Sequence, residues 1–214
     1  MTARAIDAKL DALFVEGPDD GVVVNALVLK GTGVDITRRE SRLVRLNEEG
    51  GGDAWALRQF DDKVKTARAG ARIGVIVDRD SAENDKWPAV RDRLRRLGLQ
   101  VDAPIPAGAI VDGRCGIWMW PDNVSHGDLE SFVAGIVPRS AALTYAEEAS
   151  QIAKAAHGAE YETRHARKAA LKVRSVWRDA TTAGGYGHLV RNLTLVETPA
   201  ATAFLSWFEA LYLT

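Results

Sequence analysis

Two short apolar runs that each end in acidic residues constrain the fold of this chain more than any other feature. Residues 13–15 (Leu-Phe-Val) lead into Glu16, and residues 72–77 lead into Asp78 and Asp80. Runs of this length and composition predict buried strands. In open α/β sheets, ligands bind beyond the carboxyl ends of parallel strands. If the two strands are neighbours in such a sheet, the acids that follow them converge on one edge.

Carboxylates gathered at one point need a cation, or protonation, to coexist. Mg²⁺ and Mn²⁺ are the ions that such oxygen ligands suit. Asp78 and Asp80 are two positions apart, so on a strand that continues both side chains face one side and Arg79 faces the other. A plain turn that ends a strand is the competing interpretation of these three residues. The pattern predicts a divalent metal site around Glu16.

The remaining sequence alternates between strand and helix patterns, which predicts an α/β fold with a mostly parallel sheet flanked by helices. Residues 109–120 predict an antiparallel hairpin at one side of that sheet, and residues 81–86 and 184–187 predict loops. The other expected elements are a strand over residues 42–46, a short helix near 129–133, and helices over 20–30, 53–68, 88–97, 141–157, 163–181 and 199–212.

Acidic residues and proline mark the starts of several predicted helices. Either Asp19 or Asp20 caps the first helix, and the other is then free to act as a further carboxylate. Asp53 is expected to cap the next helix, and Pro88 to occupy the first turn of the one after.

The composition indicates a cellular compartment, but it does not indicate a binding partner. A single cysteine, Cys115, excludes an internal disulfide framework, so a reducing cytoplasmic compartment is expected. Residues 1–13 carry charges that a signal peptide lacks, and no apolar run reaches transmembrane length. The net charge of −1 gives no overall electrostatic argument for nucleic acid. Basic residues do gather at 91–96 and 164–178, where solvated helix faces are the competing explanation.

The order of these motifs resembles the Toprim domain, which occurs in topoisomerases, bacterial primases, OLD-family nucleases and small ribosomal RNA maturation nucleases. Glu16-Gly17 after the first strand and Asp78-Arg79-Asp80 after a later one match its signature. Residues 118–123 and 127–130 look like a segment of the compact, stand-alone Toprim proteins related to OLD nucleases. The resemblance implies a catalytic domain over residues 1–135, with residues 136–214 as a helical extension packed on it.

The resemblance implies a metal-dependent endonuclease that hydrolyses phosphodiester bonds of DNA or RNA with two Mg²⁺ or Mn²⁺ ions. Glu16, Asp78 and Asp80 are then metal ligands, and Glu16 is also a candidate for acid and base catalysis. Asp20, four residues after the glutamate, corresponds to an acid near the second ion. Glu130 is expected to close that second position, although acids in a first helical turn are also favoured by the helix dipole alone.

OLD-like nucleases also use a lysine downstream of the acidic motifs, where it neutralises charge that develops on the phosphate. Lys168 and Lys172 are the catalytic candidates, four residues apart on one helix face. Lys168 is preferred because residues 164–168 look like the basic segment of that family. Arg164 and Arg167 are the expected substrate-binding residues. For either lysine alone, a solvated helix face is the simpler interpretation.

One difference from the Toprim pattern leaves a second function open. Many Toprim proteins carry a third acid two residues after the Asp-x-Asp pair, where this chain has Ala82. This difference argues against the topoisomerase and primase types. It also favours a catalytically silent Toprim-like module that binds or regulates a partner protein. A different α/β phosphotransfer enzyme with the same carboxylates is a third, weaker alternative.

The resemblance also extends to biological context. Small OLD-related Toprim proteins look like effectors in phage defence or toxin systems, sometimes beside an ATPase. This chain has no Walker motif, so any ATPase partner would be a separate polypeptide. The sequence leaves the oligomeric state open, and it indicates no membrane partner.

Overall fold

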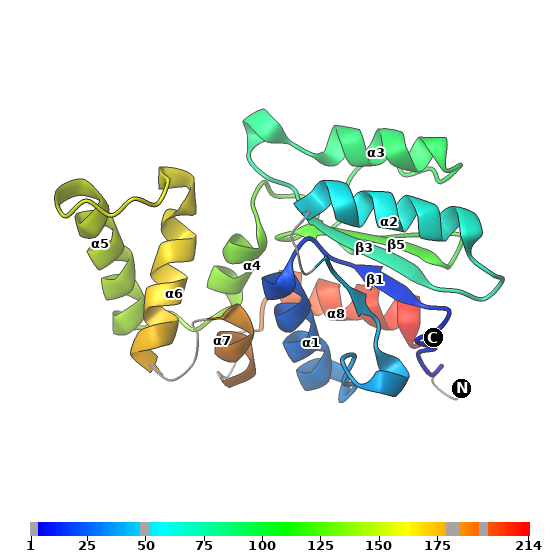
Figure 1. Cartoon of the computed structure of the whole chain (residues 1–214), viewed down its shortest axis with the longest axis horizontal. Helices are drawn as coiled ribbons and strands as arrows, with labels where there is room; N and C mark the ends of the chain where they lie inside the picture. Colours follow the sequence, from blue (N-terminus) through cyan, green and yellow to red (C-terminus); the bar gives the residue numbers. More distant parts are fainter. Residues whose placement is uncertain (1–3, 48–51, 179–184, 193–196) are drawn as a thin grey trace.

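The computed structural model describes residues 4–47, 52–178, 185–192 and 197–214, which form an α/β fold around one five-stranded sheet (Figure 1). The strands are β1 (Ala12–Phe14), β2 (Val44–Arg45), β3 (Ile73–Asp78), β4 (Ala109–Val111) and β5 (Cys115–Trp120). Their order in the sheet is β2-β1-β3-β5-β4, and every neighbouring pair is parallel except β4 and β5. The predicted α/β fold and the antiparallel hairpin at its side are confirmed.

Helices cover both faces of this sheet. Helices α2 (Gly52–Thr66) and α3 (Trp87–Arg96) lie on one face, and α1 (Pro18–Thr32) and α8 (Pro199–Tyr212) lie on the other (Figure 1). Beyond the carboxyl ends of the strands follow α4 (Leu129–Ile136), α7 (Tyr186–Asn192) and a hairpin of α5 (Ala141–Ala156) and α6 (Ala166–Arg178). Three short 3₁₀ helices are Arg39–Ser41, Ala82–Asn84 and Thr163–His165.

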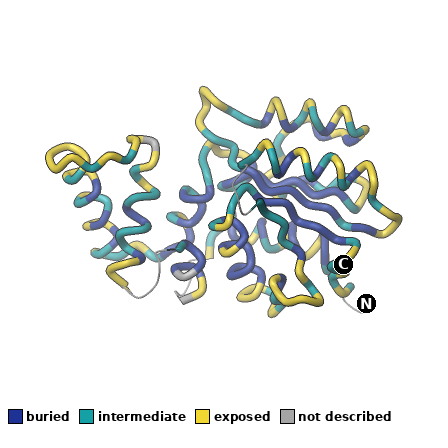
Figure 2. The backbone as a smooth tube through the Cα atoms, viewed as in Figure 1, coloured by how far each residue is buried: buried dark blue, intermediate teal, exposed yellow. Residues whose placement is uncertain are grey.

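The central strands are buried from both sides, as the dark blue strands of Figure 2 show. Strand β5 illustrates why, because its alternate side chains enter two different cores. Trp118 and Trp120 pack with Phe204 of α8, at ring-centre distances of 5.2 and 5.3 Å. Ile117 and Met119 pack in the core under α2 and α3. A strand covered on both faces reads as an uninterrupted apolar run, which is how the sequence predicted it.

The last helix, α8, closes one face of the sheet although it ends the chain. The Tyr212 hydroxyl donates to the carbonyl of Ala12 at 2.8 Å, which ties α8 to β1. Gly116 lets the helix approach β5, because a Cβ there would lie 2.3 Å from a methyl carbon of Leu211. The C-terminal region thus packs on the first 135 residues through α8. The boundary expected after residue 135 stays a prediction.

Helix starts differ from the sequence predictions in two places. Gly17, not Asp19 or Asp20, caps α1, because Pro18 takes the first helical position. Asp20 then lies in the first turn and accepts the Gly17 N–H at 3.2 Å. The expectation that Asp53 caps α2 was also wrong, since that helix begins one residue earlier and includes Asp53 in its first turn.

The predicted loop over residues 184–187 was wrong for its second half, because α7 begins at Tyr186. Residue 184, residues 48–51 of another expected loop, and residues 179–181 at the end of an expected helix lie outside the described residues. Among the helices that the structure describes, none has both the length and the apolar character that crossing a membrane requires.

Candidate functional site

The first and third strands bring two distant acids together at the carboxyl edge of the sheet. Phe14 of β1 is paired with Val75 of β3 in parallel register, so Glu16 and Asp78 extend past the same edge. The backbone N–H of Asp78 donates to Glu16 Oε1 at 2.7 Å, across 62 positions of sequence. The sequence argument from parallel strands therefore located these two residues correctly.

Glu16, Asp20 and Asp78 form a group that we call the inner acids. The Asp20 carboxylate is almost fully buried, with 7% of the residue exposed. It accepts the indole N–H of Trp120 at 2.9 Å and the Gly17 N–H at 3.2 Å. Asp78 Oδ1 accepts the Leu129 N–H, at the start of α4, at 2.9 Å. Asp20 and Asp78 are thus held by uncharged donors.

Burial and mutual repulsion shift the pKa values of the inner acids upward. Burial, with the charge of Glu16, raises the pKa of Asp20 to about 7, although the Trp120 hydrogen bond opposes this. Burial, with the charges of Glu16 and Asp20, raises the pKa of Asp78 to about 9. Burial also raises the pKa of Glu16, against the attraction of Lys86. These carboxylates hold their charge poorly without a cation beside them.

Asp53 and Asp80, which we call the outer acids, are arranged around a lysine. The Lys86 ammonium lies 3.0 Å from Asp80 Oδ2, 3.2 Å from Asp53 Oδ2 and 3.7 Å from Glu16 Oε1. Burial lowers the pKa of Lys86, but the three carboxylates outweigh burial and raise it above the ordinary lysine value. The outer side chains are also more open to solvent, with 37% of Asp53 and 42% of Asp80 exposed.

Asp80 joins the outer acids because the strand ends before it. β3 stops at Asp78, and Asp80 has a left-handed φ of 68°. Its backbone pairs with Gly127 through two hydrogen bonds of 2.8 Å. Arg79 turns to Asp85, with an ion pair of 2.9 Å. The alternation that was expected to put Asp78 and Asp80 on one face of a continuing strand therefore does not apply.

Glu130 and Lys168 form an ion pair next to the inner acids. Glu130 lies in the first turn of α4, is 8% exposed, and accepts the Tyr186 hydroxyl at 3.1 Å. The Lys168 ammonium, from α6, lies 3.1 Å from Glu130 Oε1. Burial lowers the pKa of Lys168, but the charges of Glu130, Asp19 and Asp78 outweigh it and raise the pKa. The charge of Asp78, one of the inner acids, thus acts on the Lys168 ammonium.

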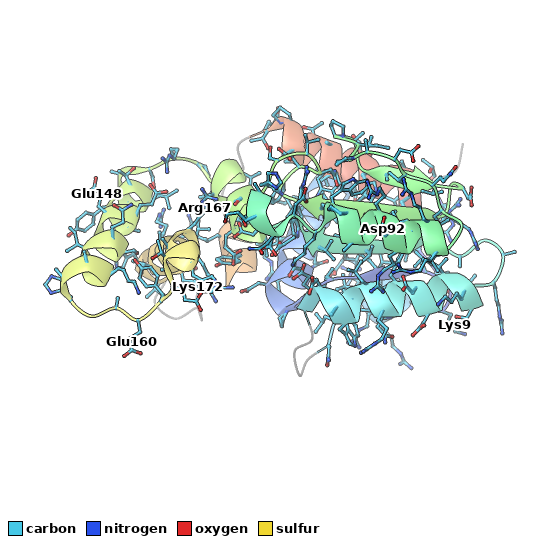
Figure 3. All side chains as sticks on the ribbon, turned by 90° about the horizontal axis from the view of Figure 1, so that it is seen from above. Lys9, Asp92, Glu148, Glu160, Arg167 and Lys172 are labelled. Carbon is cyan, nitrogen blue, oxygen red and sulfur yellow. The ribbon has the colours of Figure 1, made fainter. Side chains whose placement is uncertain are left out.

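Two of the other predicted basic residues, Lys172 and Arg167, contact residues outside the inner acids. The Lys172 ammonium is 3.6 Å from Asp19 Oδ2 and 5.5 Å from the centre of the Tyr186 ring. Arg167 donates to the hydroxyl of Ser131 on α4. In Figure 3, Arg167 and Lys172 lie on the side of the α5 and α6 hairpin that faces the rest of the molecule. The side chain of Arg164 lies outside the described part of the chain.

A cavity of about 880 Å³ opens between the end of β3, the start of α4 and α6. Its walls include six of the charged residues described above, namely Asp78, Asp80, Lys86, Glu130, Arg167 and Lys168. A larger cavity of about 1060 Å³ lies along α1 and β2, and none of the predicted metal ligands lines it. The smaller cavity is therefore a substrate-sized space that Asp78 of the inner acids and Asp80 of the outer acids both line.

The inner acids fit a hard divalent cation in their chemistry, because their donors are carboxylate oxygens with uncompensated charge. Among the residues that the structure describes, however, no three His, Cys, Asp or Glu side chains are already arranged as a ligand set for a metal ion. An ion at the inner acids would therefore require their carboxylates to turn toward it.

Fold and site together define an α/β protein with a carboxylate cluster at the carboxyl edge of a parallel sheet. The chain belongs to the family described as "Protein of unknown function (DUF3226)", whose model matches residues 11–213. This match extends over the sheet and over the helices that follow it. No curated protein and no solved structure matches the chain.

Sequence reasoning missed four residues that shape the site: Asp53, Lys86, Trp120 and Tyr186. Lys86 was predicted to lie in an exposed loop. The one indication of its role was its spacing of six residues from Asp80, which allows the loop to fold back onto that acid. Trp120 carried no signal beyond its strand, because its indole reaches an acid 100 positions away. Spacing in sequence does not reveal contacts of this kind.

Proposed function

We propose that this protein is a metal-dependent nuclease of the Toprim type, which hydrolyses phosphodiester bonds of DNA or RNA with Mg²⁺ or Mn²⁺. The observation that carries the proposal is the convergence of Glu16 and Asp20, at the junction of β1 and α1, with Asp78 at the end of β3. Burial, together with their mutual repulsion, raises the pKa values of Asp20 and Asp78, as expected of carboxylates that await a cation.

A divalent ion bound to these oxygens would supply Lewis acidity and lower the pKa of an attacking water. Glu16 is the inner acid that also faces Lys86 at the outer acids, and its carboxylate is the proposed acceptor of the proton from that water. Lys168 lines the cavity beside Asp78, where its ammonium stabilises charge that develops on phosphate oxygens. Arg167 lines the same cavity and is suited to a backbone phosphate.

Cleavage assays test the proposal directly. Single-stranded and double-stranded DNA and RNA are incubated with the protein in Mg²⁺, in Mn²⁺ or in a chelator. We expect cleavage of at least one polymer in metal only, and a loss on the order of a thousandfold in Glu16→Gln. Glu148→Gln is the matched control, because Glu148 is exposed on α5 and does not line the cavity, and in Figure 3 it lies on the outer side of the hairpin, away from Arg167 and Lys172. Metal-independent cleavage, or full activity in Glu16→Gln, would reject the assignment.

A specific observation supports a second candidate, a catalytically silent module that binds nucleic acid or a partner. The Lys86 ammonium already occupies the centre of the outer acids, where a cation would otherwise bind. If all the acids were satisfied within the chain, no ion would be needed. Calorimetry separates the two functions: a silent module shows no Mn²⁺ binding even with nucleic acid present, whereas the nuclease binds Mn²⁺ in both conditions.

A further inference from the structure

We infer that Lys86 takes the place of one of the two ions that the Toprim resemblance implies, so that the cluster holds a single divalent ion, at the inner acids. The inference rests on the proposed function only in requiring that the cluster binds a divalent ion. It concerns which half of the cluster is neutralised by a side chain of the protein and which half by an ion from solution.

The Lys86 ammonium has the contacts of an ion in a carboxylate cage. It lies within 3.7 Å of oxygens from Glu16, Asp53 and Asp80, which come from three separate segments, and 23% of its side chain is exposed. A Mg²⁺ ion would bind such oxygens at about 2.0–2.1 Å. An ammonium and a divalent ion cannot share the Asp53 and Asp80 oxygens at close range, so the lysine excludes an ion from the outer acids.

The backbone around Lys86 holds the ammonium in this position. The Lys86 N–H donates to the carbonyl of Arg79 at 3.1 Å, which closes the loop that leaves β3. Asp85 accepts the Trp87 N–H at 3.0 Å at the start of α3, and it also pairs with Arg79 at 2.9 Å. The lysine is therefore fixed between two ordered elements, and its side chain needs to reach only across the end of β3.

The uncompensated negative charge lies at two of the inner acids, Asp20 and Asp78. In the described part of the chain, no lysine or arginine nitrogen lies within ion-pair distance of Asp20 or Asp78. Lys168 is paired with Glu130, and Lys86 with the outer acids. A buried carboxylate pair without a cation is costly, so the inner acids are where an ion from solution gains most. One ion there and one ammonium at the outer acids complete the cluster.

The test counts bound ions with Mn²⁺ as the probe. Calorimetry and the electron paramagnetic resonance of free Mn²⁺ measure the number bound by wild type, Lys86→Met and Lys65→Met. Lys86→Met keeps a long, unbranched side chain and removes the charge. Lys65→Met is the control, at an exposed position of α2. We expect one ion for wild type, two for Lys86→Met and one for Lys65→Met. Two ions in wild type, or one in a folded Lys86→Met, would overturn the inference.

If Lys86→Met does not fold, Lys86→Arg, which keeps the positive charge, is used in its place. Wild type and Lys86→Arg then decide: one ion in each supports the inference, and two in either overturn it. The outcomes also separate the inference from the proposed function. Two bound ions with Mn²⁺-dependent cleavage overturn the role of Lys86 alone, whereas no bound ion and no cleavage overturn both.

Discussion

The outer acids and the inner acids lie at the same sheet edge, but different groups offset their charge. Asp53 and Asp80 are half exposed and lie within 3.2 Å of the Lys86 ammonium. Asp20 and Asp78 are more enclosed, and the hydrogen bonds that they accept within the described residues come from uncharged N–H groups. The chain thus neutralises one half itself. The other half depends on protons or on a cation from solution, and chemistry that needs a metal is expected there.

The largest expected effect is a difference between the two halves in catalysis. Asp78→Asn removes an inner carboxylate and should lower kcat/KM for nucleic acid by a hundredfold to about a thousandfold. Asp53→Asn removes one of three carboxylates around Lys86 and should cost less than about tenfold, because the ammonium keeps its other partners. Initial rates at saturating Mn²⁺ measure both. Equal losses would remove the distinction between the halves.

Proton release should follow the raised pKa values of the inner acids. At pH 6, with Asp20 at about 7 and Asp78 at about 9, both carboxyls are largely protonated, so each Mn²⁺ ion should displace about two protons. At pH 8 only Asp78 remains protonated, and about one proton should be released. Calorimetry in buffers of different ionisation enthalpy counts them. Release that does not vary with pH would place the ion elsewhere.

The same pKa shifts predict how stability depends on pH. A carboxyl whose pKa is raised by folding favours the folded state at low pH, and this contribution is lost as pH rises through the folded pKa. Without metal, the protein should therefore lose stability from about pH 4, where these carboxyls ionise in the unfolded chain, until the pH passes the folded pKa values of about 7 for Asp20 and about 9 for Asp78. Mn²⁺ should remove most of that loss. Melting temperatures across this range, with chelator and with Mn²⁺, measure the effect, and identical curves would count against it.

A smaller effect is expected from the donor that holds Asp20. Trp120→Phe removes the 2.9 Å hydrogen bond and should weaken Mn²⁺ binding by about tenfold, because groups that orient metal ligands matter to this extent. Trp118→Phe is a matched control, since its buried indole N–H has no hydrogen-bond partner in the described structure. Equal Mn²⁺ affinities in the two variants would show that Asp20 does not contribute to the ion site.

The smallest expected effect concerns Glu130. Tyr186→Phe removes a 3.1 Å hydrogen bond and should lower the free energy of unfolding by about 1 kcal/mol, with no change in Mn²⁺ affinity. Urea denaturation and calorimetry provide the two readouts. If Mn²⁺ affinity instead fell further than in Trp120→Phe, Glu130 would have to be counted among the inner acids.

The sheet and the meeting of Glu16 with Asp78 could be predicted because both follow from local pattern and one rule of parallel sheets. Asp80 could not be placed, since its left-handed φ and its pairing with Gly127 arise from a bridge between distant segments. Lys86 and Tyr186 reach the acids through tertiary folding of segments that looked like loops. Contacts of this kind depend on how the chain folds back on itself, so no repeating pattern in the sequence indicates them.

Anomalous diffraction from crystals of the protein grown with Mn²⁺ locates the bound cation directly. We expect one manganese peak coordinated by oxygens of the inner acids, with the Lys86 ammonium still in contact with Asp53 and Asp80. A peak at the position of the ammonium, or crystals saturated with Mn²⁺ that show no peak at Glu16, Asp20 and Asp78, would contradict this arrangement.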